Sequence, residues 1–395
     1  MRSLILAIFS LLLNVTNSSH TLASSSSDTS SVDIAPFDQA LTFAKTSKQY
    51  GSKTILVTSF QDNIILGRDL SKAFINGERD AIDLFHRYQY DQIQNMLNDE
   101  QRYPVTRVPS SHLGLPVQLA DIHIAVGTNY RDHAQETDVT RTPFLFSKRV
   151  TPTPWNAQVS SKSRALDYEA EVAMVVLNKV EYENTPYRVG FMLANDLSDR
   201  EVLMHHVDPK DIESGKGFAQ GKSAPGLLPV GNLFVIPNMS DAFLSRLSLQ
   251  LSVNNSVRQQ AKVKHLIWQR KAIFNEIWKN SGRTWAFNDS QIQLLPEPHT
   301  IPERTLILTG TPAGTVFQGI PFMTKMRGVG QWLFSGMEPS LQYHVVERYL
   351  SESESNYLKN RDLVTVRAPF LGTLKNTITS PTILETQTIS GTTGD

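Results

Sequence analysis

The chain of 395 residues contains no cysteine. This absence excludes thiolate catalysis, disulfide bonds, zinc sites with thiolate ligands and iron–sulfur clusters. It also means that cysteine usage gives no information about the cellular compartment. Neither sign of charge is in excess, because lysine plus arginine and aspartate plus glutamate each number 38. No net field therefore favours nucleic acid or an anionic membrane as a partner. The function has to come from local sites.

An apolar run of about 20 residues, the length that crosses a bilayer as a helix, is also missing. A shorter apolar run at 4–13 follows Arg2 and precedes small and polar residues up to Ala23. This pattern is typical of a secretory signal peptide, so we expect cleavage near Ala23 and a periplasmic or secreted protein. A short anchor or a start codon placed too early are the alternatives, and without a signal peptide the protein would stay in the cytoplasm.

The composition, with 40% apolar and 19% charged residues, predicts a globular chain of two or three domains. After a signal peptide at 1–23, the serine-rich residues 24–32 are typical of a flexible spacer. Residues 33–119 mix strand-like and amphipathic segments and are predicted to form a small α+β domain. Residues 120–395 are predicted to form a β-rich catalytic domain with an insert at about 315–360. The predicted fold class is therefore α+β with a predominance of strands.

Short strand-like runs separated by Pro, Gly and Asn support this reading. They lie at 54–58, 63–66, 122–126, 170–177, 190–194, 233–236, 247–253, 305–309 and 363–366. One longer stretch, at 80–98, has apolar residues at helical spacing.

Acidic residues at the start of the run 170–177 predict a metal site. Glu169 and Glu171 alternate with an alanine, so on a strand both carboxylates project from one face, about 7 Å apart at Cα. Asp196, further along the chain, would supply a third carboxylate. Mg²⁺ and Mn²⁺ prefer oxygen ligands and keep coordination positions open for water or substrate. Three carboxylates are therefore a suitable number of ligands for the protein to supply. Taken alone, such acids also suit the exposed face of an ordinary strand.

Two further motifs contain groups suited to acid–base chemistry and charge stabilisation. His133 and Glu136 are three residues apart, so a short helix would place both on one face and let the carboxylate orient the imidazole as a base. Lys222 stands among small residues and glycine, where it could stabilise developing negative charge. A surface helix pair and a solvated loop lysine are the structural alternatives.

An apolar strand at 306–309 breaks into the sequence Gly310-Thr311-Pro312-Ala313-Gly314. Backbone N–H groups and the Thr311 hydroxyl in such a turn could hold a carboxylate, although a purely structural turn would look the same.

Taken in order, these motifs resemble the fumarylacetoacetate hydrolase family, and specifically its acylpyruvate hydrolase and oxaloacetate decarboxylase-like branch. The resemblance runs from about Ala120 to Asn376. The matching residues are Asn129, Tyr130, His133, Glu136, Glu169, Glu171, Asp196, Arg200, Lys222, Ser223, Val253, Asn254, Gln259 and 309–314.

The resemblance implies a mixed β-sheet roll, usually dimeric, with a magnesium site in a cleft; Mn²⁺ and Ca²⁺ are alternative ions. It implies that the metal ligands are Glu169, Glu171 and Asp196. It further implies a His133–Glu136 dyad, a substrate contact from Lys222, and substrate binding by Arg200, Lys148 and Thr311. The helix that bears the dyad often acts as a lid in the family.

Two departures from the family pattern bear on the substrate. The insert at 315–360 could cap the pocket, cover a dimer edge or decorate the surface. Leu203 occupies a place where close relatives often have a polar substrate contact.

These observations predict a Mg²⁺-dependent hydrolase that cleaves a carbon–carbon bond in a short 2,4-dioxo acid. In this hypothesis the ion chelates the 2-oxo acid, His133 deprotonates a water and Lys222 meets the oxyanion. Other reactions suit the same site: oxaloacetate decarboxylation or tautomerisation, isomerisation of a diacid, and dehydration of a 2-keto-3-deoxy sugar acid. An exported 2-oxo acid binding protein without catalytic activity is the alternative of a different class.

Overall fold

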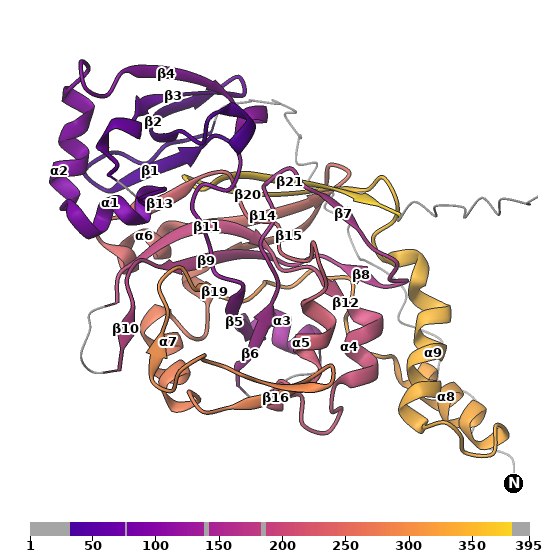
Figure 1. The fold of residues 1–395 in the computed structure, drawn as a ribbon. Coiled ribbons are helices and arrows are strands. Elements are labelled where there is room, and N and C mark those ends of the chain that lie inside the picture. The colour runs from indigo at the N-terminus through magenta and orange to yellow at the C-terminus, as the bar shows by residue number, and fades with distance from the viewer. Residues whose placement is uncertain (1–31, 76, 138–141, 183–186, 381–395) are drawn as a thin grey trace, which may run out of the picture. The chain divides into compact units, whose positions relative to one another are not determined.

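Two β-sheets packed against each other form the centre of the structure (Figure 1). The computed structural model describes residues 32–75, 77–137, 142–182 and 187–380. The predicted signal peptide and all but the last residue of the predicted spacer lie outside the described residues.

The larger sheet has ten strands in the order β4-β3-β2-β1-β13-β11-β9-β19-β5-β6. It is a mixed sheet, because β19 runs parallel to β5 while the other neighbouring strands are antiparallel. Its strands are β1 Ala40–Lys45, β2 Thr54–Gln61, β3 Ile64–Asp69, β4 Val105–Pro109, β5 Ile122–Gly127, β6 Phe144–Arg149, β9 Ala170–Val176, β11 Val189–Asn195, β13 Phe234–Pro237 and β19 Leu306–Leu308.

The second sheet has five strands in the order β15-β14-β20-β21-β7, with β21 parallel to β7. Its strands are β7 Gln158–Ser160, β14 Ser248–Val253, β15 Ser256–Lys262, β20 Leu363–Ala368 and β21 Gly372–Thr379. Three two-stranded pairs complete the β-structure: β8 Leu166–Asp167 with β12 Ser198–Asp199, β10 Val180–Glu181 with β18 Thr300–Ile301, and β16 Thr284–Phe287 with β17 Ser290–Gln293.

Strand β9 is buried on both faces, which explains its uninterrupted apolar sequence. Val172 and Met174 belong to the core that includes residues of the second sheet. Ala173 and Val175, which point the other way, pack in a separate cluster with Phe146. Residues of odd number on β9 therefore lie on the face away from the second sheet.

The first four strands continue the large sheet, because β1 pairs with β13 in antiparallel register. Helices α1 (Ala81–Arg87) and α2 (Tyr90–Asn95) lie beside this part, and the amphipathic stretch predicted at 80–98 divides between them (Figure 1). The side chain of Asp80 caps α1 by accepting from the Ile82 N–H. A separate domain at 33–119 remains a prediction, although the structure contains its predicted strands and amphipathic segments.

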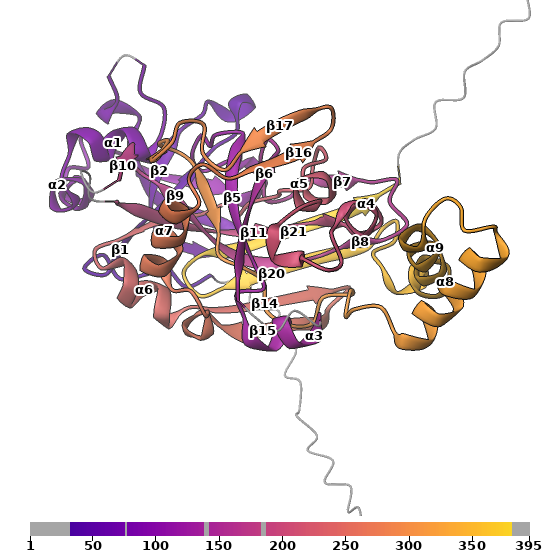
Figure 2. The ribbon, with the colours of Figure 1, turned by 90° about the horizontal axis from the view of Figure 1, so that it is seen from below.

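The helices are α1 Ala81–Arg87, α2 Tyr90–Asn95, α3 Arg131–Glu136, α4 Arg200–His206, α5 Phe218–Lys222, α6 Ser240–Arg246, α7 Arg270–Lys279, α8 Phe322–Phe334 and α9 Leu341–Ser353. Among the described residues, no helix has the length and apolar character needed to cross a membrane. The predicted insert contains α8 and α9, which pack on each other at the edge of the sheets, and α9 lies beside α4 (Figures 1 and 2).

Candidate active site

Three acidic side chains from two separate stretches of the sequence meet at one end of β9. Glu169 directly precedes β9 and Glu171 lies on it, so strand alternation places both on one face. Asp196 directly follows the neighbouring strand β11, and its N–H donates to the Glu169 carbonyl at 2.8 Å. One carboxylate oxygen of each residue lies within 4.8 Å of the others, and all three side chains are buried. The structure thus brings the three predicted metal ligands together.

Three buried cations surround these carboxylates. The Lys222 Nζ, at the end of α5, lies 2.8 Å from Glu169 Oε2 and 2.7 Å from Asp196 Oδ2. Arg200, the first residue of α4, places its Nη2 2.6 Å from Glu169 Oε1. Lys148, on β6, places its Nζ 2.5 Å from Asp196 Oδ1 and also donates to two backbone carbonyls. All three cations are therefore committed to carboxylates.

A fourth buried carboxylate, that of Asp167, was not predicted as a site residue. It accepts from Arg200 Nε at 2.9 Å and from two backbone N–H groups at the start of the insert. A signal was present in the sequence, because Asp167 continues the alternation of Glu169 and Glu171 by one step towards the N-terminus. Asp167 thus links the start of the insert to Arg200, which in turn contacts Glu169 of the carboxylate cluster.

The electrostatics of the cluster are asymmetric. Burial opposes ionisation of Glu169, but the charges of Lys222 and Arg200 overcome it and lower the pKa of Glu169 to about 2. Burial and the negative charges of Asp196 and Glu169 together raise the pKa of Glu171 well above its usual value. Glu171 is therefore the acid whose charge the surrounding cations compensate least.

A count of the buried charges also shows that one carboxylate lacks a compensating cation. Among the described residues of the cluster, four buried carboxylates face three buried cations: Asp167, Glu169, Glu171 and Asp196 against Lys148, Arg200 and Lys222. The fully ionised cluster has one negative charge in excess, and the three clustered ligand groups offer oxygen atoms only. A hard divalent cation fits this donor set, because such ions take carboxylate oxygens and would remove the excess charge.

The predicted dyad lies on the short helix α3. The Nδ1 atom of His133 is 3.3 Å from Glu136 Oε2, and both side chains are mostly buried. Glu136 is itself held by the N–H of Gly314, at 3.1 Å from each carboxylate oxygen, and by the Gln318 amide at 2.9 Å. The Gly314 turn and the start of the insert therefore fix the orientation of the carboxylate that faces the imidazole.

The turn after β19 supports the cluster from the other side. The N–H of Gly310 donates to Glu171 Oε2 at 2.6 Å. Gly310 has φ of +102°, and a Cβ there would lie 2.7 Å from the Cβ of Asn129, so the position needs glycine. Thr311 donates its hydroxyl to a carbonyl of β9 and accepts from the Gln259 amide at 2.9 Å.

A cavity of about 100 Å³ adjoins the carboxylates. Six of the nine predicted site residues line it: His133, Glu169, Asp196, Arg200, Lys222 and Thr311. Of the other three, Glu136 contacts His133, Lys148 contacts Asp196, and Glu171 belongs to the carboxylate cluster. Lys148, for which we predicted a substrate contact, is thus placed as a partner of Asp196 rather than on the cavity wall.

The remaining wall contains residues that were not predicted. Thr128 lines the cavity, and its buried hydroxyl oxygen has no hydrogen-bond partner among the described residues. It could therefore donate to a neutral carbonyl oxygen of a ligand. The apolar part of the wall comes from Val126, Phe144, Phe146, Leu203, Met204, Val207, Ile212, Phe218 and Phe317.

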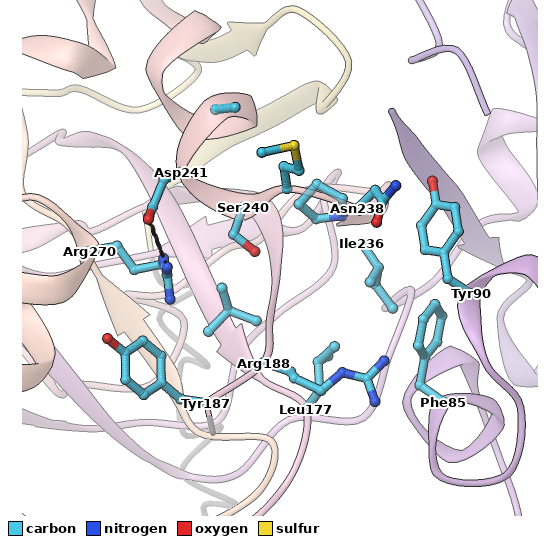
Figure 3. Close-up of a pocket in the computed structure, with 14 residues that line it drawn as sticks. Phe85, Tyr90, Leu177, Tyr187, Arg188, Ile236, Asn238, Ser240, Asp241 and Arg270 are labelled. Atoms are coloured by element: carbon cyan, nitrogen blue, oxygen red, sulfur yellow. Dashed lines mark hydrogen bonds and ion pairs between the residues drawn. The ribbon is translucent and has the colours of Figure 1, made fainter. Parts of the chain in front are cut away.

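A second pocket, of about 410 Å³, lies away from this site (Figure 3). Phe85 and Tyr90, on α1 and α2, line one side of it, and Arg270, on α7, lines another. The guanidinium of Arg270 is bonded to Asp241 at 2.6 Å. No predicted site residue lines this pocket, so its size does not make it the candidate active site.

Buried carboxylates beside a histidine–glutamate pair, at the end of a strand in a mixed β fold, are an arrangement typical of metal-dependent enzymes. The chain matches the family model "Fumarylacetoacetate (FAA) hydrolase C-terminal" over residues 122–379. It therefore belongs to the fumarylacetoacetate hydrolase family, whose members are enzymes. This confirms the family, and with it the fold class, predicted from the sequence.

The sequence matches to named relatives extend over only part of each relative. The chain is 28% identical over 220 residues to the mitochondrial oxaloacetate tautomerase FAHD2A of Bos taurus, and this region is 53% of this chain and 62% of the relative. It is 28% identical over 215 residues to the oxaloacetate tautomerase YisK of Bacillus subtilis, covering 51% of this chain and 62% of the relative. The match thus spans less than two thirds of these relatives.

A solved structure extends the likeness of fold. The fumarylacetoacetate hydrolase of the psychrophile Exiguobacterium antarcticum aligns with a TM-score of 0.54 and 19% identity, covering 86% of this chain and all of that one. At this identity the comparison shows the fold alone.

Proposed function

We propose that this protein is a Mg²⁺-dependent hydrolase that cleaves a carbon–carbon bond in a short 2,4-dioxo acid. The observation that supports the proposal most directly is the shared cavity, whose wall contains two of the three clustered carboxylates, His133 and Lys222. A base, a cation and a site for an oxygen-binding ion are the groups that hydrolysis of a 1,3-dicarbonyl bond requires.

The three carboxylates Glu169, Glu171 and Asp196 would hold the ion, with Mn²⁺ as an alternative to Mg²⁺. When bound, the divalent ion supplies Lewis-acid stabilisation of the negative charge that develops on the 2-oxo group.

His133 and Lys222 would act on the second carbonyl. Glu136 faces Nδ1 of His133, which leaves Nε2 to take a proton from a water molecule. The water oxygen bonds to the C4 carbonyl carbon. The resulting oxyanion would lie near Lys222, whose positive charge would stabilise it at close range while its N–H groups stay bonded to Glu169 and Asp196. Collapse breaks the C3–C4 bond and leaves its electron pair on C3 of a pyruvate enolate, which takes the proton back from His133. Water and an acylpyruvate thus give one carboxylic acid and one pyruvate.

Oxaloacetate chemistry is the second candidate function. It is favoured by the two relatives described above, both of which are named oxaloacetate tautomerases. Tautomerisation needs only proton transfer at C3, and decarboxylation needs the same stabilised enolate without a nucleophilic water. The same groups would also serve a diacid isomerase or a dehydratase of 2-keto-3-deoxy sugar acids.

The test is to incubate the purified protein and Mg²⁺ with acetylpyruvate, oxaloacetate and a 2-keto-3-deoxy sugar acid. We expect acetate and pyruvate in equal amounts from acetylpyruvate. Conversion of the sugar acid alone would contradict the hydrolase proposal. The variant His133→Ala should lower turnover by about 100-fold or more, the usual contribution of a general base. Unchanged turnover with metal binding intact would remove His133 from the mechanism.

We also propose that the protein is exported and that it forms a homodimer. Mass spectrometry of the native protein should find a mature N-terminus near Ser24, whereas an intact Met1 in the cytosol would contradict export. Sedimentation equilibrium should give about twice the chain mass, and a monomer would contradict the dimer.

A further inference from the structure

The insert contributes a fixed part of the active-site wall. The N–H groups of Val316 and Phe317 donate to the Asp167 carboxylate at 2.9 and 3.1 Å. The Phe317 ring lies over the Arg200 guanidinium, 5.6 Å from the ring centre, and meets the Tyr349 ring of α9 edge to face. Phe317 also lines the cavity. The start of the insert is therefore anchored to the residues that support the carboxylate cluster.

Among the described residues, the cavity wall contains no lysine or arginine that is free of the carboxylate cluster. Phe317, Leu203 and Met204 line the cavity together with three further phenylalanines. The lysine and arginine that line the cavity are Lys222 and Arg200, and both are already bonded to carboxylates of the cluster. Among the described residues that line the cavity, Thr128 has a buried neutral hydroxyl without a hydrogen-bond partner.

The charge count adds to this picture. The fully ionised cluster has one negative charge in excess, so a divalent ion and one ligand carboxylate would bring these seven groups to neutrality. The Glu136 carboxylate beside His133 lies outside this count and adds a further negative charge nearby. A second ligand carboxylate would leave a negative charge against an apolar wall, where desolvation disfavours it strongly.

We infer that the insert makes this site select 2-oxo acids whose far end is uncharged and apolar, and reject those with a second carboxylate. This inference rests on the proposed function, because it assumes that the carboxylate cluster binds the 2-oxo acid end. It assigns Phe317 and Leu203 as specificity-determining residues. Aliphatic acylpyruvates are then preferred over dicarboxylates such as oxaloacetate.

The test compares two 2-oxo acids of equal heavy-atom count by calorimetry in Mg²⁺. In 2-oxoglutarate the far end is a carboxylate, and in 5-methyl-2-oxohexanoate it is an isopropyl group; neither contains the 1,3-dicarbonyl bond that the enzyme would cleave. We expect the monocarboxylate to bind about 100-fold or more tightly than the dicarboxylate, comparable with the discrimination of an apolar pocket against a polar isostere.

Two variants locate the selectivity. Phe317→Ala opens the apolar wall, and Leu203→Lys places a cation in it. Each should reduce the ratio of the two binding constants by about 10-fold or more. Phe334→Ala is the matched control, because this phenylalanine belongs to the same insert but is 96% exposed. It should leave the ratio unchanged.

The outcomes separate the inference from the proposed function. Equal binding of both acids, with acetylpyruvate still cleaved, would overturn the inference and leave the hydrolase intact. A ratio that survives in both folded variants would overturn the roles of Phe317 and Leu203. Binding of neither acid, with no cleavage of acetylpyruvate, would contradict the proposed function on which the inference rests.

Discussion

At the scale of single residues, the three clustered carboxylates differ in how far the protein itself stabilises their charge. Glu169 and Asp196 each have lysine partners in the protein, whereas Glu171 is bonded to a backbone N–H. Its raised pKa, caused by burial and by the neighbouring negative charges, means that the folded protein gains little from ionising it. Glu171 is therefore the proposed ligand whose replacement best separates metal binding from folding.

The variant Glu171→Gln should weaken Mg²⁺ binding by at least about 10-fold, since even indirect partners of a metal ligand are worth that much. The glutamine oxygen can still accept from Gly310, and the repulsion from Asp196 disappears. The melting temperature without added Mg²⁺ should therefore stay unchanged or rise. Calorimetric titration and thermal denaturation check the two effects. Glu181→Gln, at an exposed glutamate on β10, is the control for both.

Glu171→Gln binding Mg²⁺ as tightly as the natural protein would remove Glu171 from the ligand set. A large fall in melting temperature would instead show that the ionised carboxylate contributes to folding.

How far the sequence predicts the site depends on the residue. The Glu169 and Glu171 pair follows from strand alternation, and the His133–Glu136 contact follows from helical spacing. The proximity of Asp196 could not be derived from spacing, because it depends on β11 pairing with β9. No sequence pattern identified Phe317 as part of the cavity wall. Its position depends on hydrogen bonds to Asp167, a residue about 150 positions away along the chain.

At the scale of elements, the strands were more predictable than the helices of the insert. Runs at 170–177 and 190–194 are apolar on both faces because β9 and β11 are central strands, and this pattern is visible in the sequence. In contrast, α8 exposes large side chains such as Phe322 and Phe334. Its sequence of interleaved Phe, Met and Trp therefore gave no clear amphipathic pattern from which to predict a helix.

Helix α8 packs on α9 through a glycine. A Cβ on Gly328 would lie 2.7 Å from the Cα of Val345, so Gly328→Ala would force the helices apart. Overpacking of this kind costs about 1–3 kcal/mol, which exceeds the gain of at most about 1 kcal/mol in helix propensity. We expect faster hydrogen exchange across 322–353.

The matched control is Gly330→Ala, in the same helix, where a Cβ would have no heavy atom within 4 Å. It should slow exchange across the same residues, because alanine favours the helix and meets no obstacle. Equal effects of the two alanines would show that the contact at Gly328 does not hold α8 against α9.

At the scale of the whole molecule, the ten-stranded sheet joins the first strands to the strands of the active site. The register pairs Phe43 with Phe234 across β1 and β13, and Phe191 of β11 lies opposite Val235 of the same strand β13. Arg304, just before β19, adds ion pairs at 2.8 Å to Asp80 and 2.7 Å to Asp83. Contacts of this extent indicate that the N-terminal strands and β9 unfold together.

Substitution of a core residue in β1 tests this coupling. Leu41 is fully buried and belongs to the same apolar cluster as Ala173 and Val175 of β9. Leu41→Ala should lower the free energy of unfolding by about 2–5 kcal/mol, the usual result of removing a buried leucine side chain. Native-state hydrogen exchange should show this loss at the amides of β9 as well as at those of β2, whereas Lys48→Ala, at an exposed position in the same region, should change neither. If only the β2 amides lost protection, residues 33–119 would be a domain that unfolds on its own, and the active site would not depend on it for stability.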